Sequence, residues 1–155
     1  MRRAHIWFAA LVTLVCFLPA LGNGFAVLTL GQVQVWRDSE TLWSRALAVG
    51  PSAIAHAKLG VVRDEQGRTK EAIAHYRAAL ALHPDMPDAY NDLGIALARL
   101  GRWNEAVEQY RKALARRPGS VEAHLNLAAA LERLGRSSEA AAHAREAQRL
   151  QMKGR

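Results

Sequence analysis

Four of the six histidines are the side chains best suited to chemistry, because imidazole nitrogens bind transition-metal ions. They occupy two positions that recur at one interval: His56 and His124 share the first, and His75 and His143 share the second. If the chain is a stack of helical units, the members of each pair lie two units apart, roughly 16–20 Å at the usual spacing of packed helices. Metal ligands converge on one ion at about 2.0–2.1 Å. We therefore expect these histidines to be tolerated positions on a repeated helix surface, without partners, and we expect no metal site.

No other group of residues has the spacing of a reaction centre. Ser137 and Ser138 precede Glu139 in the pattern that begins a helix. Each glycine of the repeated region has a turn or packing role, which leaves no phosphate-binding loop. Cys16 is the only cysteine, so no internal disulfide can form. The sequence thus predicts a non-catalytic protein with no cofactor.

The chain is basic, with 21 lysines and arginines against 14 aspartates and glutamates, and a formal net charge of +7. The densest positive group consists of Arg111, Lys112, Arg116 and Arg117. Basic faces commonly bind nucleic acid or anionic membranes. A face for single-stranded nucleic acid also carries aromatic rings for stacking, and the repeats have few that are not needed for packing. We expect solvated helix surfaces and no nucleic-acid partner.

The segments that carry these residues repeat every 34 residues between positions 53 and 154. Small, aromatic and proline residues keep their places in the units: Gly60, Gly94 and Ala128; Ala72, Ala106 and Ala140; Tyr76, Tyr110 and Ala144; Pro84 and Pro118. Gly67, Gly101 and Gly135, each followed by arginine, recur where a turn would join two helices. The pattern predicts an all-α stack of helical pairs.

This pattern resembles the tetratricopeptide repeat, a 34-residue helix–turn–helix unit that stacks into a solenoid. The resemblance is specific in the units 53–86 and 87–120. It is weaker in the unit 121–154, where Ala128 replaces glycine and Ala144 replaces the aromatic residue. A terminal unit has no further neighbour to fill, so a smaller and more polar capping helix is expected there.

The resemblance implies that the first helix of each unit lines a concave face that binds extended peptides. In this chain we assign to that face Lys58, Val61, Asn91, Ile95, Arg99, Asn126 and Arg133. The asparagines would hydrogen-bond a peptide backbone, and the cations would engage acidic groups. Asp64, Asp88 and Asp92 on the same face argue against a clamp for a terminal carboxylate, because like charges repel. The expected partner is a protein or peptide of unspecified sequence.

The first third of the chain differs from the repeats. Residues 6–30 contain no charged side chain, and a helix of that length, about 37 Å, would cross a hydrocarbon core of about 30 Å. Arg2 and Arg3 precede this run, so residues 1–5 are expected to be cytoplasmic and the repeats to lie on the non-cytoplasmic side, periplasmic or extracellular. A single-pass transmembrane helix is favoured over a cleaved signal peptide and over the last helix of a larger membrane protein, and both alternatives stay open.

Residues 31–52 form a junction and an incomplete first unit, in which Trp43, Ala46 and Pro51 match the aromatic, small and proline positions. The run from Trp36 to Trp43 resembles a segment of the polytopic membrane glycosyltransferases of O-mannosyltransferase type, which carry C-terminal tetratricopeptide repeats. The resemblance implies relatedness to that C-terminal part, whereas the family's catalytic residues lie in upstream membrane domains. We therefore favour a membrane-anchored, non-catalytic scaffold for protein or peptide binding. A fragment or remnant of such a glycosyltransferase is the alternative.

Overall fold

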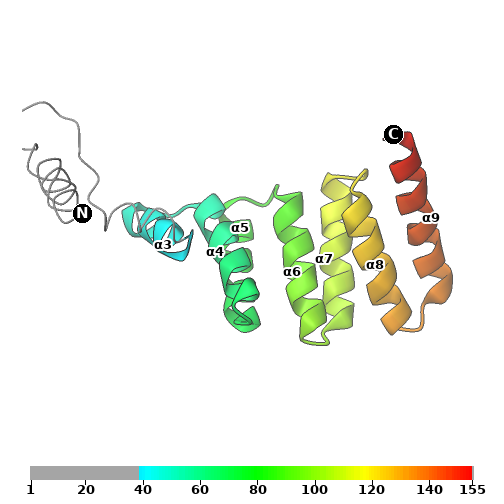
Figure 1. The fold of residues 1–155 in the computed structure, drawn as a ribbon, viewed down its shortest axis with the longest axis horizontal. Coiled ribbons are helices and arrows are strands. Elements are labelled where there is room, and N and C mark those ends of the chain that lie inside the picture. The colour runs from blue at the N-terminus through cyan, green and yellow to red at the C-terminus, as the bar shows by residue number, and fades with distance from the viewer. Residues whose placement is uncertain (1–38, 155) are drawn as a thin grey trace, which may run out of the picture. The chain divides into compact units, whose positions relative to one another are not determined.

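The structure, a computed structural model, describes residues 39–154. Its helices are α3 (Ser39–Val49), α4 (Ala53–Glu65), α5 (Thr69–Leu82), α6 (Pro87–Arg99), α7 (Trp103–Arg116), α8 (Val121–Arg133) and α9 (Ser137–Lys153) (Figure 1). The chain divides into two compact units, Met1–Leu42 and Trp43–Arg155, and the description below concerns α4–α9 of the second. The predicted membrane segment, residues 6–30, lies outside the described residues. Among the helices of residues 39–154, none is long and apolar enough to cross a bilayer.

The six helices α4–α9 form three pairs that are neighbours in sequence. Helix α4 packs against α5, α6 against α7, and α8 against α9, while α5 contacts α6 and α7 contacts α8. The first helices of successive pairs also touch, α4 with α6 and α6 with α8. Figure 1 shows these helices side by side in chain order. Contacts restricted to neighbours are typical of a repeat solenoid, so the predicted all-α helical-hairpin stack is confirmed for this part of the chain.

A glycine in the left-handed backbone region ends the first helix of each pair. The φ angles of Gly67, Gly101 and Gly135 are +75°, +73° and +72°. The amide of the next residue, Arg68 in the first turn, donates to the carbonyl of Arg63 at 2.8 Å, and the other two turns repeat this bond. Side chains with a Cβ rarely adopt this conformation, so glycine is the residue that the turn requires. The predicted turn role of these glycines is confirmed.

The glycine and tyrosine positions of the first two units fit one another. A Cβ built on Gly60 of α4 would lie 2.5 Å from Cε1 of Tyr76 on α5, and one on Gly94 of α6 would lie 2.5 Å from Cε1 of Tyr110 on α7. Both tyrosine rings are only 2% exposed. The sequence indicates that these glycines let the second helix approach, and the structure shows that the part that approaches is the tyrosine ring. The glycine and the tyrosine ring therefore pack as a matched pair of residues.

The third unit lacks this pair and has a small core of its own. Ala128 is 8% exposed at the glycine position, and Ala144 is exposed where the other units place a tyrosine. Only Ala140 and Ala147 of α9 are buried. Helix α9 therefore covers α8 with small side chains and presents polar residues outward, as expected of a terminal helix.

Candidate peptide-binding groove

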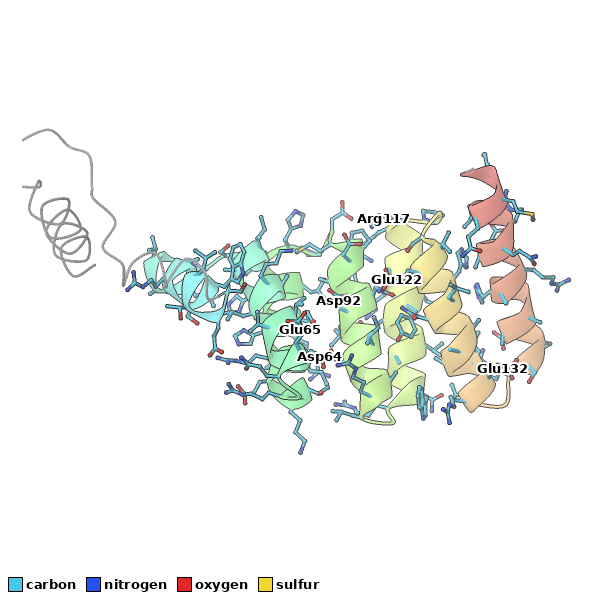
Figure 2. All side chains as sticks on the ribbon, viewed as in Figure 1. Asp64, Glu65, Asp92, Arg117, Glu122 and Glu132 are labelled. Carbon is cyan, nitrogen blue, oxygen red and sulfur yellow. The ribbon has the colours of Figure 1, made fainter. Side chains whose placement is uncertain are left out.

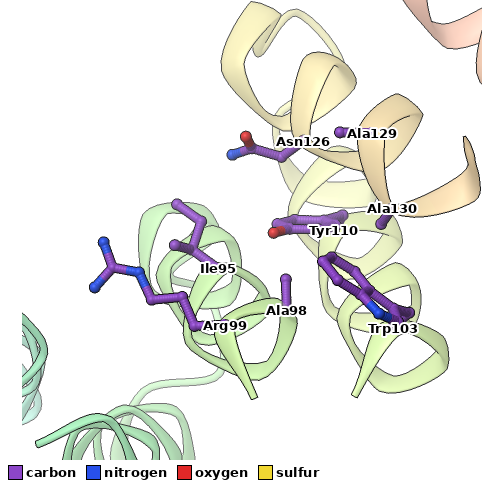
Figure 3. Close-up of a pocket in the computed structure, with 8 residues that line it drawn as sticks. All are labelled: Ile95, Ala98, Arg99, Trp103, Tyr110, Asn126, Ala129 and Ala130. Carbon is purple, nitrogen blue, oxygen red and sulfur yellow. The ribbon is translucent and has the colours of Figure 1, made fainter. Parts of the chain in front are cut away.

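Two adjoining hollows lie on the side of the solenoid formed by the first helices α4, α6 and α8. The first, of about 260 Å³, is lined by Ile95, Ala98, Arg99, Trp103, Tyr110, Asn126, Ala129 and Ala130 (Figure 3). The second, of about 200 Å³, is lined by Val61, Asp64, Glu65, Tyr76, Asp92, Ile95 and Arg99. Ile95 and Arg99 of α6 line both hollows. Together these residues form one surface, called the groove below, that extends from α4 across α6 to α8.

Four of the residues assigned to the concave face line this groove: Val61, Ile95, Arg99 and Asn126. The other three, Lys58, Asn91 and Arg133, line neither hollow. Lys58 lies on α4, and its charge acts on Asp92 in the second hollow. The guanidinium of Arg133 lies 5.5 Å from the ring centroid of Trp103, a cation–π arrangement between α8 and α7.

Asn91 is buried and its amide is used within the solenoid. It is 6% exposed. Its Oδ1 accepts from Nδ2 of Asn126 at 3.0 Å, and its Nδ2 donates to Oε1 of Glu122 at 3.0 Å. This chain of hydrogen bonds joins α6 to α8 and satisfies a polar group that would be costly to bury alone. In this structure Asn91 therefore links two repeat units, and Asn126 is the asparagine that also lines the groove.

Several arginines on and beside the groove are paired with acids of other helices. Nη1 of Arg99 donates to Oδ2 of Asp64 at 2.8 Å, across α6 and α4. Arg117 forms a two-pronged pair with Asp88, and Nη2 of Arg111 lies 3.2 Å from Oε2 of Glu139. Arg111 and Arg117 of the densest basic group of the sequence thus connect α7 and its C-terminal end to α9 and α6.

Arg116, the remaining arginine of that basic group, binds to the connection between α5 and α6. Its Nε donates to the carbonyl of Pro84 at 2.8 Å, and its guanidinium lies 4.3 Å from the ring centroid of Tyr90. It also lies 3.7 Å from Oδ1 of Asp85. A guanidinium that donates to a carbonyl and stacks on a ring is held in place, so this charge serves packing between units.

Asp92 is a groove acid that lies partly buried without a partner in the described residues. It is half-buried on α6, and within residues 39–154 no side chain forms a hydrogen bond or an ion pair with its carboxylate. Burial, and to a smaller extent the charges of Glu122, Asp88 and Asp64, together raise the pKa of Asp92 to about 6, against the opposing effect of Lys58. Figure 2 shows Asp92 between Asp64 and Glu65 of α4 and Glu122 of α8. The sequence identifies Asp92 only as a charge that would repel a terminal carboxylate. The structure adds that this residue of α6 lines the groove.

Comparison with family models identifies the repeat. A model described as "TPR repeat" matches residues 64–101, and one described as "Tetratricopeptide repeat" matches residues 91–154. The chain is a tetratricopeptide-repeat protein. The two matches together span residues 64–154, which is most of the region 53–154 where the sequence shows its 34-residue period.

Solved structures share the fold of this tetratricopeptide-repeat (TPR) chain. A crystal structure of MamA superposes with a TM-score of 0.72 at 24% sequence identity, covering 98% of this chain and 93% of that one. A point mutant of MamA gives a TM-score of 0.61 at 30% identity, covering 76% of this chain and 85% of that one. These similarities establish the architecture of the TPR solenoid.

Curated relatives support the second resemblance seen in the sequence. The chain is 36% identical over 69 residues to Protein O-mannosyl-transferase TMTC1 of Homo sapiens, which is 44% of this chain and 8% of that protein. It is 33% identical over 92 residues to Protein O-mannosyl-transferase Tmtc1 of Drosophila melanogaster, 56% of this chain and 11% of that protein. The TPR chain thus matches only about a tenth of these relatives' length.

The histidines of the TPR solenoid meet in a way that the 34-residue period does not indicate. The period relates equal positions of different units, whereas the structure pairs His56 with His75 and His124 with His143, each within one unit. Each pair joins the first helix of a unit to its second. Within residues 39–154 no group of three or more histidine, cysteine or acidic side chains is arranged around a common point. The expectation that these histidines have no partners is therefore wrong.

Proposed function

We propose that this chain is a membrane-tethered, non-catalytic TPR scaffold whose groove binds an extended, positively charged segment of a partner protein. The TPR architecture supports protein interaction as the general function. The observation that selects a basic partner is the half-buried carboxylate of Asp92, which faces the groove without a counter-ion. A buried charge without a partner is costly, and a ligand cation removes that cost.

The second hollow has the lining that a lysine or arginine side chain needs. Val61, Ile95 and Tyr76 supply apolar wall, and Asp92 and Glu65 supply carboxylates. Long cationic side chains pack their methylene stems on apolar surface and keep the charged end on acids or in water. Asp64 is already paired with Arg99, so the unpaired charge of the hollow is acidic.

The net charge of the whole chain makes this preference testable. At +7, the protein attracts acidic peptides and repels basic ones over distances of about a Debye length. Binding of a basic peptide must therefore come from a local site that outweighs the general repulsion. Moderate salt weakens the general attraction for acidic peptides and leaves a half-buried contact largely intact.

A peptide titration tests the proposal. Fluorescence anisotropy with the full chain in detergent would compare an extended peptide that alternates lysine with apolar residues with a matched peptide that carries glutamate. We expect the basic peptide to bind and Asp92→Asn to weaken it about tenfold, the scale of one partly desolvated ion pair. The matched control is Glu108→Gln, which removes an exposed carboxylate of α7 outside the groove and is expected to leave affinity unchanged.

The pH dependence provides a second measure of the same contact. Because Asp92 has a pKa of about 6, its negative charge is present above that pH and is lost below it. Affinity for the basic peptide is therefore expected to fall as pH decreases from about 7.5 to about 5, with a smaller change in Asp92→Asn. Equal binding of the acidic and basic peptides at moderate salt, or an Asp92→Asn variant that binds as tightly as the original chain, would contradict the proposal.

The membrane tether is the other half of the proposal and rests on residues 6–30, which lack charged side chains. We expect the full chain expressed in cells to stay with membranes through alkaline carbonate extraction, which releases peripheral proteins. Protease added from the non-cytoplasmic side should cut the repeats. Recovery of the chain in the supernatant would remove the tether, and mass spectrometry of a shortened amino terminus would identify a cleaved signal peptide instead.

A further inference from the structure

Two histidine pairs lie between paired helices, apart from the groove. In the first pair, Nδ1 of His56 on α4 and Nδ1 of His75 on α5 are 3.1 Å apart. In the second pair, Nδ1 of His124 on α8 and Nδ1 of His143 on α9 are 3.0 Å apart. The rings are tilted by 39° and 33°, so the contact is made through the nitrogens and not by face-to-face stacking.

In the second pair the chain fixes which nitrogen of His124 carries hydrogen. Its Nε2 lies 3.1 Å from the carbonyl oxygen of Pro118, which can only accept. Neutral His124 therefore has its hydrogen on Nε2 and a lone pair on Nδ1, directed toward His143. Imidazoles that bind metals are usually oriented in this way, with the distal N–H donated to a carbonyl or carboxylate. His124 is 8% exposed, so its orientation is also held by packing.

The spacing of the two nitrogens suits one metal ion. With metal–nitrogen bonds of about 2.0–2.1 Å, nitrogens separated by 3.0–3.1 Å subtend about 95° at the ion. Angles near 90° are those of neighbouring ligands in square-planar or tetragonal sites, which Cu²⁺ prefers. Among the divalent first-row ions Cu²⁺ also has the highest affinity for nitrogen ligands, so Cu²⁺ is the ion that we consider.

We propose that each histidine pair binds one Cu²⁺ ion through its two Nδ1 atoms, with water completing the coordination, and that the His124–His143 pair binds more tightly. The carbonyl of Pro118 orients His124, while no such carbonyl bond holds His56 in the described part of the chain. An ion bound in this way would link the two helices of a unit, α4 to α5 or α8 to α9. This inference does not depend on the proposed peptide groove.

The middle unit supplies a matched control within the same chain. Its residues at the two histidine positions are Tyr90 and Gln109, so it has no pair. Glutamine is therefore tolerated by the fold at the second-helix position, which makes His75→Gln and His143→Gln conservative variants. The exposed His83, which forms no pair with another histidine in the described residues, provides a control for single-imidazole binding.

A Cu²⁺ titration followed by electron paramagnetic resonance and calorimetry tests the inference on the full chain in detergent. We expect the original chain to bind two ions, each with the nitrogen splitting of two imidazoles in its resonance spectrum. The single variants His75→Gln and His143→Gln should each bind one ion. The double variant should bind none at these sites. His143→Gln should remove the tighter ion, and His83→Ala should change nothing. Combining Tyr90→His with Gln109→His should add a third ion. Two-site binding that survives the double variant, or no binding above that of a single imidazole, would overturn the inference.

Discussion

Replacing Gly94 by alanine is expected to lower the free energy of unfolding by about 2–3 kcal/mol, the range of a severe overpacking change. The new Cβ would lie 2.5 Å from Cε1, 2.7 Å from Cδ1 and 2.9 Å from Cζ of Tyr110. Carbon atoms attract at about 3.5–4.0 Å and repel strongly at these distances. Alanine also favours a helix over glycine by about 1 kcal/mol, which opposes the clash but is smaller. Urea unfolding followed by circular dichroism would measure the difference.

A double-mutant cycle separates this clash from a general loss of stability. Tyr110→Ala alone is expected to cost about 3–4 kcal/mol because it removes a ring that is 2% exposed. Once the ring is gone, the alanine at position 94 has space and keeps its helix propensity. The double variant should therefore be about as stable as Tyr110→Ala, far from the sum of the two losses. Additive losses, or a Gly94→Ala chain as stable as the original, would contradict the tight glycine–ring contact.

The third unit already contains the double replacement. Ala128 occupies the glycine position and Ala144 the tyrosine position, and helices α8 and α9 still pack. This arrangement shows that alanine is acceptable at the first-helix position when no ring faces it. It also explains why the glycine and the aromatic residue are absent together from the terminal unit. Without the ring, the first helix does not need glycine to make room, and without the glycine there is no space for the ring.

The helical pairs and their turns could be predicted from the sequence because each depends on nearby residues. A repeating period fixes which positions share a helix face, and a glycine followed by arginine marks the turn. The left-handed φ angles of Gly67, Gly101 and Gly135 and the buried Tyr76 and Tyr110 follow directly from that pattern. Nothing in these features requires knowledge of how one helix is rotated against the next.

The pairing of individual polar side chains could not be predicted, because it depends on the angle and register between packed helices. The histidines meet at a separation of 19 residues within a unit. Asn91 meets Glu122 and Asn126 at separations of 31 and 35 residues. None of these separations equals the 34-residue period, so comparing equal positions of the units does not reveal them. The lack of an ion-pair partner for Asp92 in the described residues could not be predicted for the same reason.

The second large effect is expected for Asn91→Asp, which adds a carboxylate at a buried position. At a pH of about 7.5 we expect the free energy of unfolding to fall by about 2–4 kcal/mol, because the change removes a buried hydrogen-bond donor and places negative charge beside Glu122. In the original chain Nδ2 of Asn91 lies 3.0 Å from Oε1 of Glu122, so the new oxygen would face an acid at hydrogen-bond distance. Asp92, whose pKa is already raised to about 6, lies next to it in the chain.

The pH dependence of this loss follows from the sign of the expected pKa shift. Burial and like charges raise the pKa of the new aspartate in the folded chain above its unfolded value of about 3.9. Above the raised pKa the folded state carries the full electrostatic cost, and below a pH of about 3.9 both states are protonated and that cost disappears. The stability difference from the original chain should therefore shrink as pH falls from about 7.5 to about 4. Thermal unfolding at a series of pH values would measure it.

The matched control for this change is Asn104→Asp, which makes the same substitution at an exposed position in the first turn of α7. A negative charge near a helix N-terminus is neutral or slightly favourable, so the control should change stability by no more than about 0.5 kcal/mol. If Asn91→Asp loses the same stability at about pH 4 and about pH 7.5, the loss comes from the hydrogen bonds and not from charge. In that case Glu122 would contribute little to the potential around Asn91, and burial alone would account for the raised pKa of Asp92 on which binding of a basic partner depends.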